Sequence, residues 1–211
     1  MKGLILKDII NMKGQLMLYM VIFAMWMAVG IVNKSAEFFI GVMQMLIVMI
    51  PILSLEYDEK TKWERFAITM PLTRRQLVIS KYLFCLIVIA VIMIPAAAGG
   101  LIIGGDPETV LVMIALSVPL GLILNSVILP VMFRFGVKKG RFMFMAIIAL
   151  FVLAGFAVSK LPAVARLMDA AIPTFAADGV IFTTVIFWLA GLGLAAVSMA
   201  ISCKIYGGKE F

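Results

Sequence analysis

The sequence has no histidine and few charged side chains. Charged residues make up 14% of its 211 residues, against about a quarter in a typical soluble domain, while hydrophobic residues reach 64%. Long apolar runs such as MAIIALFVLAGFAV show no alternating polar face. These shortages exclude a soluble fold, and the chain is predicted to be a polytopic membrane protein.

The apolar segments also lack the residues that intramembrane chemistry needs. No acidic residue, Lys or Arg lies in the interior of a segment expected to span the membrane, and Glu37 stands at the first residue of one. Proton-coupled carriers need titratable groups there, intramembrane metalloproteases need His and carboxylate ligands, and a serine hydrolase needs a base. The phosphate loop Gly-x-x-x-x-Gly-Lys-[Ser/Thr] is missing as well. We therefore expect no enzyme, catalytic residue, metal site or cofactor in this chain, and any ATP hydrolysis would belong to a separate subunit.

Six segments are apolar and long enough to cross a hydrocarbon layer of about 30 Å as helices. They lack the alternation that membrane strands require, so an all-α fold is the remaining interpretation. The expected spans are residues 15–32, 37–55, 82–103, 109–133, 142–159 and 180–202. The whole chain, residues 1–211, is interpreted as a single transmembrane domain.

Residues 1–14 mix lysines with apolar residues and do not have the layout of a cleavable signal peptide. Lys2, Lys7 and Lys13 recur among leucine and isoleucine side chains. This amphipathic pattern predicts an interfacial helix whose lysines lie among lipid headgroups. A disordered basic leader is the alternative.

Basic residues are concentrated on one side of the six-span arrangement. Both termini share a side with the second and fourth loops, and that side holds 15 of the 18 Lys and Arg, since the other three are Lys34, Lys160 and Arg166. The positive-inside rule then puts both termini in the cytoplasm. Contact with anionic membrane lipid accounts for the net charge of +7, so no nucleic-acid partner is needed.

The loop 56–81 carries ten charged residues, yet its local signals are too strong for a simple linker. Residues 60–68 predict a short helix with Trp63 and Phe66 one turn apart. Pro71 ends that element, and Thr73-Arg-Arg-Gln76 predicts a capping box that starts the next helix. Aromatic and basic side chains of this kind favour a protein-docking element. An interfacial loop whose aromatics lie in the headgroups is the alternative.

Two further features concern the outer face and the membrane interior. Residues 160–178 predict a short amphipathic helix on the outer side, either a simple surface helix or an external re-entrant one. Gln44 and Asn125 are the polar residues best suited to face a pathway, and hydrogen bonding between helices is the alternative role for both.

Three features resemble the small permease subunits of bacterial ATP-binding-cassette (ABC) exporters of type 2. The opening KGLILKDIINMKGQL is similar to the family's amphipathic elbow helix, and the six-span layout is also shared. The stretch EYDEKTKWERFAITMPLTRRQLVISKYL resembles its acidic, Trp-containing first cytoplasmic loop. Met70 stands where the family often shows leucine.

The resemblance implies a function and a set of partners. Loop 56–81 would contain the coupling helix, which is seated in a groove of a partner ABC ATPase that binds ATP and Mg²⁺. The implied contacts are Trp63, Glu64, Arg65, Phe66, Met70 and Pro71. The working unit would pair two permeases, identical or related, in the bacterial plasma membrane.

The uncharged interior suits an amphipathic or antimicrobial peptide, or another hydrophobic cargo. A membrane-embedded immunity or assembly protein that binds a peptide toxin without transport is the alternative function.

Overall fold

In the computed structural model, the described residues 2–70, 73–159 and 179–208 fold into helices without strands, which confirms the all-α prediction. The expected outer helix at 160–178 lies outside the described residues. The helices are α1 (Lys2–Asn33), α2 (Ala36–Lys60), α3 (Trp63–Ile68), α4 (Arg74–Ile102), α5 (Pro107–Phe135), α6 (Val137–Ser159) and α8 (Gly179–Gly207).

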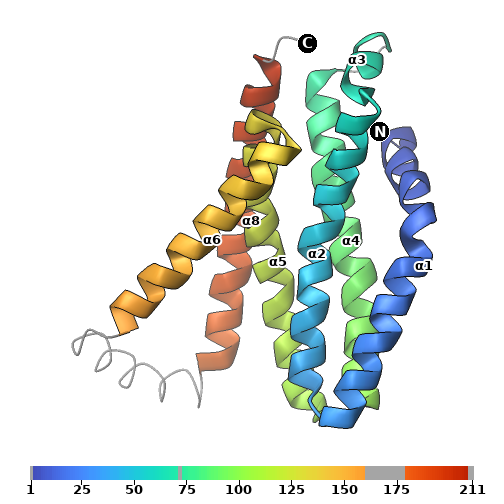
Figure 1. The fold of residues 1–211 in the computed structure, drawn as a ribbon. Coiled ribbons are helices and arrows are strands. Elements are labelled where there is room, and N and C mark those ends of the chain that lie inside the picture. Colours follow the sequence, from blue (N-terminus) through green and yellow to red (C-terminus); the bar gives the residue numbers. More distant parts are fainter. Residues whose placement is uncertain (1, 71–72, 160–178, 209–211) are drawn as a thin grey trace.

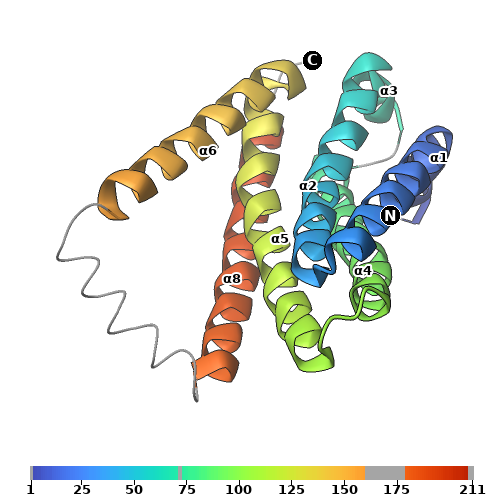
Figure 2. The same ribbon diagram turned by 60° about the horizontal axis from the view of Figure 1, so that its bottom comes forward.

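The long helices form one elongated bundle (Figure 1). Helix α5 is central: it packs against α2 and α4 on one side and most extensively against α8 on the other. Helix α1 covers α2 and α4 at the outer edge, and α6 leans away from the bundle in both views (Figures 1 and 2). Helix α3, the start of α1 and the end of α8 lie at the same end of the bundle, which we call the α3 end.

Short capped turns join the helices at the opposite, far end. Ser35 is the N-cap of α2, where its hydroxyl accepts a hydrogen bond from the Phe38 amide at 3.3 Å. Asp106 caps α5 in the same way through the Thr109 amide at 3.2 Å, and Pro107 follows at the first helical position. The local sequence thus explains why these hairpins turn where they do.

Two apolar clusters fill the bundle, one towards each end. The far-end cluster centres on Phe39, Met43 and Ile47 of α2, which face α4 and α5. Gly99 of α4 permits this packing, because a Cβ there would lie 2.5 Å from the Phe39 ring. The cluster at the α3 end joins α2, α4, α5 and the end of α8 through residues such as Val78.

Fewer of the described helices meet the requirements of a membrane span than the predicted six. Among the described residues, α2, α4, α5 and residues 182–207 of α8 are long and apolar enough to span a membrane. Helix α1 makes a fifth only if its two halves, Gly3–Gln15 and Met17–Asn33, form one span across a bend of 63°. The bend follows Gly14, and glycine weakens a helix. Six spans are therefore not confirmed, and the placement of residues 1–14 at the membrane surface stays a prediction.

The boundaries around loop 56–81 also need correction. Helix α2 does not end at residue 55 but continues to Lys60, so Glu56, Asp58 and Glu59 lie on a helix and not in a loop. Helix α3 is shorter than the predicted 60–68 and begins at Trp63. The apolar count missed the extra turn of α2 because its side chains are charged, although their contacts within the bundle hold the helix together.

Candidate functional site

Helix α3 follows α2 after a tight turn at the α3 end of the bundle. Thr61 ends α2, since its amide donates to the Tyr57 carbonyl at 3.0 Å and its hydroxyl donates to the same oxygen at 2.8 Å. Lys62 then adopts a left-handed conformation with φ of 52°, which separates α2 from α3. The six residues of α3 are therefore presented beyond the last turn of α2.

The side chains of α3 face opposite ways. Ala67 is fully buried and fixes α3 to the bundle, whereas Phe66 is 56% exposed. The Trp63 ring lies 5.5 Å from the Phe66 ring, but it is half-buried and packs against Lys7 of α1, whose Nζ lies 4.4 Å from the ring centroid. Of the two predicted aromatic contacts, Phe66 is thus the one that points to a partner, and Trp63 joins α3 to α1.

The remaining predicted contacts are described only in part. Met70 is half-buried just after α3, while Pro71 lies outside the described residues. Glu64 and Arg65 are on α3, and nothing is described of their side chains. The role of all six residues in partner binding stays a prediction.

The start of α4 has the predicted capping box. The Thr73 hydroxyl accepts from the Gln76 amide at 3.3 Å, and the Gln76 side chain accepts from the Thr73 amide at 3.0 Å. The next residue, Arg74, donates to the Gly207 carbonyl at 2.7 Å, which joins α4 to the end of α8. The start of α4 is therefore fixed by these contacts.

A cluster of four charged residues lies beneath α3, and we call it the buried ion cluster. It consists of Lys7 and Asp8 from α1, Asp58 from α2 and Lys81 from α4. Lys81 Nζ contacts Asp8 Oδ1 at 2.8 Å and Asp58 Oδ2 at 2.6 Å, and it donates to Ser54 Oγ at 2.8 Å. Lys7 Nζ contacts Asp58 Oδ1 at 2.5 Å and Asp8 Oδ1 at 3.1 Å.

The buried ion cluster balances two cations against two anions away from solvent. Asp8 is 1% exposed, and its Oδ2 has no hydrogen-bond partner in the described part of the chain. A cavity of about 280 Å³ adjoins the cluster, bordered by Trp63, Arg134 and Tyr206 among others. Because a buried charge without its partner is costly, the cluster holds α1, α2 and α4 in one arrangement.

Sequence reasoning missed the buried ion cluster. It placed Asp8 in an interfacial helix and Asp58 and Lys81 in a water-exposed loop, because each is flanked by other charged or polar residues outside the apolar runs. The only local signal is that Asp8 is the single acidic residue among the basic residues of the first fourteen. Lys81 is 73 residues from Asp8, and Lys7 is 51 residues from Asp58, so no periodicity links these pairs.

The opposite face of the α2 end holds the start of α6, an arrangement that we call the α6 anchor. Glu59 Oε2 accepts a hydrogen bond from the Val137 amide at 2.7 Å, where α6 has a free N–H group. Glu56 pairs with Arg141 one turn further along α6 and with Lys60 at 2.8 Å. Two carboxylates of α2 therefore fix the first turns of α6.

Gln44 and Asn125 lie within the bundle and contact helix backbones. Asn125 is buried on α5, and its amide donates to the Gly121 carbonyl at 2.9 Å and to the Ile47 carbonyl at 3.4 Å. Gln44 of α2 reaches α5 as well, where its amide nitrogen can donate to the Ser117 carbonyl at 3.2 Å. Both residues connect α2 with α5.

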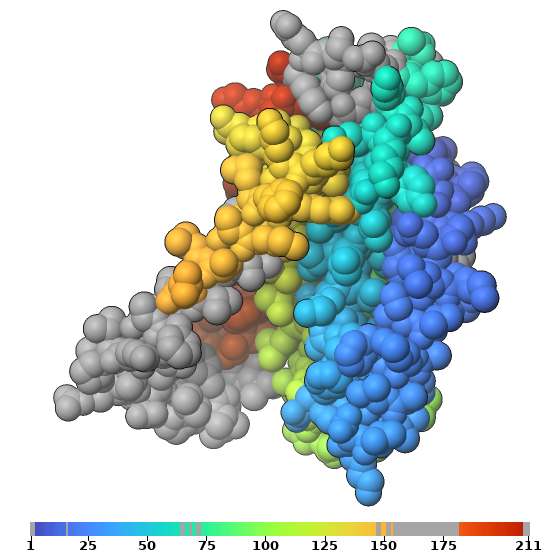
Figure 3. Space-filling view, in the orientation of Figure 1, coloured from blue at the N-terminus to red at the C-terminus, as the bar shows by residue number. Residues whose placement is uncertain are grey.

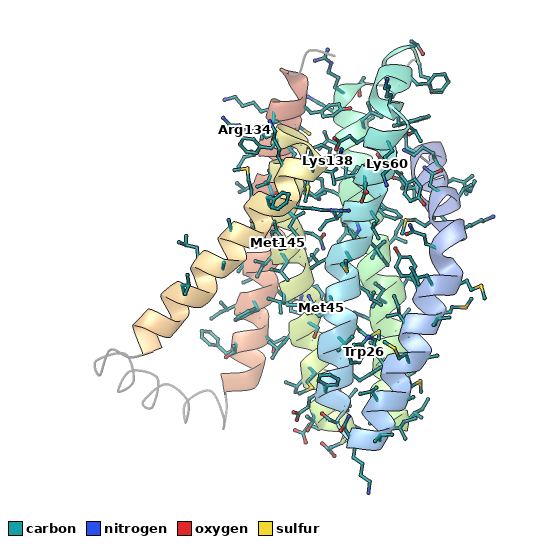
Figure 4. All side chains as sticks on the ribbon, viewed as in Figure 1. Trp26, Met45, Lys60, Arg134, Lys138 and Met145 are labelled. Carbon is teal, nitrogen blue, oxygen red and sulfur yellow. The ribbon has the colours of Figure 1, made fainter. Side chains whose placement is uncertain are left out.

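Both residues also border open space: Asn125 lines a smaller apolar hollow between α4, α5 and α8, and Gln44 lines a larger groove. An apolar groove of about 630 Å³ runs between α2, α5 and α6, with Gln44 on its wall and the Glu56–Arg141 pair at its rim. Met45 of α2 and Met145 of α6 lie on its two sides (Figure 4), and the surface is hollowed beside α6 (Figure 3). The groove is large enough for an apolar ligand. A pathway role for Gln44 and Asn125 stays a prediction.

Comparison with known proteins relates nearly the whole chain to one family. The model of a family described as ABC-2 family transporter protein matches residues 3–207. No curated protein and no solved structure matches the chain. The matched range includes α3, the buried ion cluster and the α6 anchor.

Proposed function

Because the chain belongs to the ABC-2 family of transporter proteins and is a membrane permease component, we propose that it works as the permease of an ATP-driven exporter. In this proposal two permeases, identical or related, form the translocation pathway. Separate ABC ATPase subunits bind ATP and Mg²⁺ and drive the cycle. The absence of a phosphate loop from the sequence supports this division of labour, since the chain has no motif with which to hold the nucleotide itself.

The observation that carries the proposal is the exposed face of α3. A six-residue helix fixed at its base by the buried Ala67, with the large apolar Phe66 exposed, has the form of an element that docks into a groove. Helix α3 lies in the chain between the end of α2 and the capped start of α4. A displacement of α3 by a partner would therefore be transmitted to these long helices. We assign α3 as the coupling helix and Phe66 as its central contact.

The distribution of charge supports the orientation of the permease. Helix α3 lies at the end of the bundle where the basic residues gather, including Lys60 and Lys138 (Figure 4), while Lys34 stands in the turn at the far end. The positive-inside rule then puts α3 and both termini in the cytoplasm of a bacterial cell, where an ATPase and its nucleotide are available.

The apolar groove beside α6 supports the class of cargo. Its walls are almost entirely hydrocarbon and thioether side chains, which adapt to varied apolar ligands. An amphipathic peptide or another hydrophobic molecule fits such a surface better than a charged solute.

Co-purification tests this function. The wild type, solubilised in mild detergent from its native cell, should retain a nucleotide-hydrolysing subunit, and Phe66→Ala should reduce its recovery about tenfold, as expected for a central interface residue. Phe182→Ala is the matched control, because Phe182 is an exposed phenylalanine of α8 near the far end. If the wild type retains no ATPase, the exporter proposal fails and a toxin-binding immunity or assembly protein becomes the better explanation.

A further inference from the structure

Helix α6 is fixed to the rest of the protein only near its start, as far as the described residues show. Gly136 joins α5 to α6 as a single residue with φ of 78°, a conformation that suits glycine. Gly140 packs closely on α5, since a Cβ there would lie 2.6 Å from Met132 Sδ. Glu59 accepts from the Val137 amide in this first turn.

Beyond its first two turns, in which Arg141 and Phe144 still contact the bundle, α6 leaves it. Phe142, Met145, Leu150 and Leu153 are all exposed large side chains, with Phe142 at 78%. The axis of α6 diverges from α5 and α8 towards its end in both views (Figures 1 and 2). A helix held at one end in this way can swing about its base without breaking a packed core.

The residues that hold this base belong to the turn of α2 that leads into α3. Glu59 precedes the α2 terminus by one residue, and Glu56 lies one turn earlier on the same face. Asp58, between them, points to the other face and joins the buried ion cluster. The end of α2 is therefore connected in three directions: to α3 through the chain, to α1 and α4 through Asp58, and to α6 through Glu56 and Glu59.

We propose that Glu56 and Glu59 are positioning residues that pass a displacement of α3 to α6, so that α6 is the arm that widens or narrows the apolar groove. This proposal rests on the proposed function, because the partner ATPase supplies the displacement. The buried ion cluster makes α1, α2 and α4 a stiff block, and the α6 anchor turns a small tilt of that block into a larger movement at the distant end of α6. The groove lies between the block and the arm, so its width follows the angle of α6.

Distances between spin labels test the proposal. Both cysteines are replaced by alanine, and labels are placed at Met45→Cys on α2 and Leu153→Cys on α6, two exposed positions on helices that border the groove. Double electron–electron resonance is recorded for the isolated chain, for its complex with the co-purified ATPase, and for that complex trapped with ATP. The test variant is Glu56→Gln/Glu59→Leu, which removes the ion pair and the acceptor for the Val137 amide.

Two matched controls separate the anchor from a general charge effect. Glu59→Gln keeps an acceptor oxygen for Val137, and Lys139→Gln removes an exposed charge from the same turn of α6. In the wild type and both controls, ATP should shift the distance distribution. In the test variant the shift should be lost, while ATPase binding stays at the wild-type level.

An ATP-dependent shift of wild-type size in the test variant overturns the proposal. If that variant does not fold, Arg141→Gln replaces it, because this change removes the ion pair from the α6 side, and the same readings apply. Recovery of the ATPase separates a failure of the proposed function from a failure of this proposal alone. If no ATPase is recovered, the proposed function fails and this proposal fails with it, even where the distribution of the test variant broadens. If an ATPase is recovered but ATP moves no label in the wild type, the positioning role alone is wrong.

Discussion

The two faces of the last turn of α2 make opposite kinds of contact. On one face Asp58 lies in the buried ion cluster, among charges that are almost entirely removed from solvent. On the other face Glu56 pairs with Arg141, whose side chain is 41% exposed, and Glu59 accepts from a single backbone amide. One turn of helix therefore has a face whose contacts resist rearrangement and a face whose contacts rearrange more easily.

The difference teaches how burial sets the strength of similar ion pairs. A buried pair is not worth much compared with apolar packing, but removing one partner leaves a charge without solvent, so the arrangement resists change. A partly exposed pair keeps its water and can open and close at little cost. The same residue types thus make a fixed joint between α1, α2 and α4, and a movable joint between α2 and α6.

The largest expected effect is on the fixed joint. Lys81→Met leaves Lys7 alone to balance Asp8 and Asp58 in a buried site and should lower the free energy of unfolding by about 3–5 kcal/mol. Unfolding of the purified protein in detergent, followed by circular dichroism, measures this. Lys139→Met removes an exposed lysine and should change the stability by less than about 0.5 kcal/mol. Equal effects of the two changes would contradict the distinction between the joints.

A medium effect is expected at the base of the movable joint. Gly136→Ala forces a side chain onto a backbone with φ of 78° and should cost about 1–3 kcal/mol. Because α6 is held mainly by its base, the change should also displace α6, which spin labels at positions 45 and 153 would report. Gly193→Ala in α8 is the control, since a Cβ there meets nothing within 4 Å and no positive φ is involved. If the labels report the wild-type position of α6 in Gly136→Ala, the result would count against a hinge at this residue.

A smaller effect is expected for the ion pair of the movable joint. A double-mutant cycle of Glu56→Gln and Arg141→Gln should give a coupling free energy of about 0.2–1 kcal/mol, the range of exposed pairs. The same cycle on Asp58→Asn and Lys81→Gln should give a clearly larger value, because that pair is buried. The measurement decides which coupling free energy is larger. A larger value for Glu56–Arg141 than for Asp58–Lys81 would contradict the distinction between the two joints.

The smallest effect is the response of the two joints to salt. Raising the ionic strength to about 1 M shortens the screening length to about 3 Å and should weaken the exposed Glu56–Arg141 pair, which broadens the distance distribution between positions 45 and 153. The buried ion cluster joins α1 to α4. The distance distribution between labels at Leu6→Cys on α1 and Leu83→Cys on α4 should therefore not change. Broadening of both distributions would mean that the cluster is open to solvent.

The comparison also shows which parts of the structure can be predicted from the sequence. Local signals were sufficient for the Thr73 capping box and for a short helix with Trp63 and Phe66. They were not sufficient for the end of α2, because hydropathy treats Glu56, Asp58 and Glu59 as loop residues while their partners come from α1, α4 and α6. The opposite directions of Trp63 and Phe66 could not be predicted either, since they depend on Lys7 packing against the Trp63 ring from another helix.

The most direct test of the whole account is site-directed crosslinking to the ATPase from α3. In a chain whose cysteines are replaced by alanine, Thr69→Cys and Phe182→Cys each present one exposed thiol, at the C-cap of α3 and near the far end respectively, and Phe66 is left in place. A short thiol-to-amine crosslinker is applied to the complex in native membranes, and the products are identified by mass spectrometry. The account predicts a covalent product with an ATP-hydrolysing subunit from position 69 and none from position 182. A product from position 182, or an ATPase that co-purifies but never crosslinks at position 69, would contradict it.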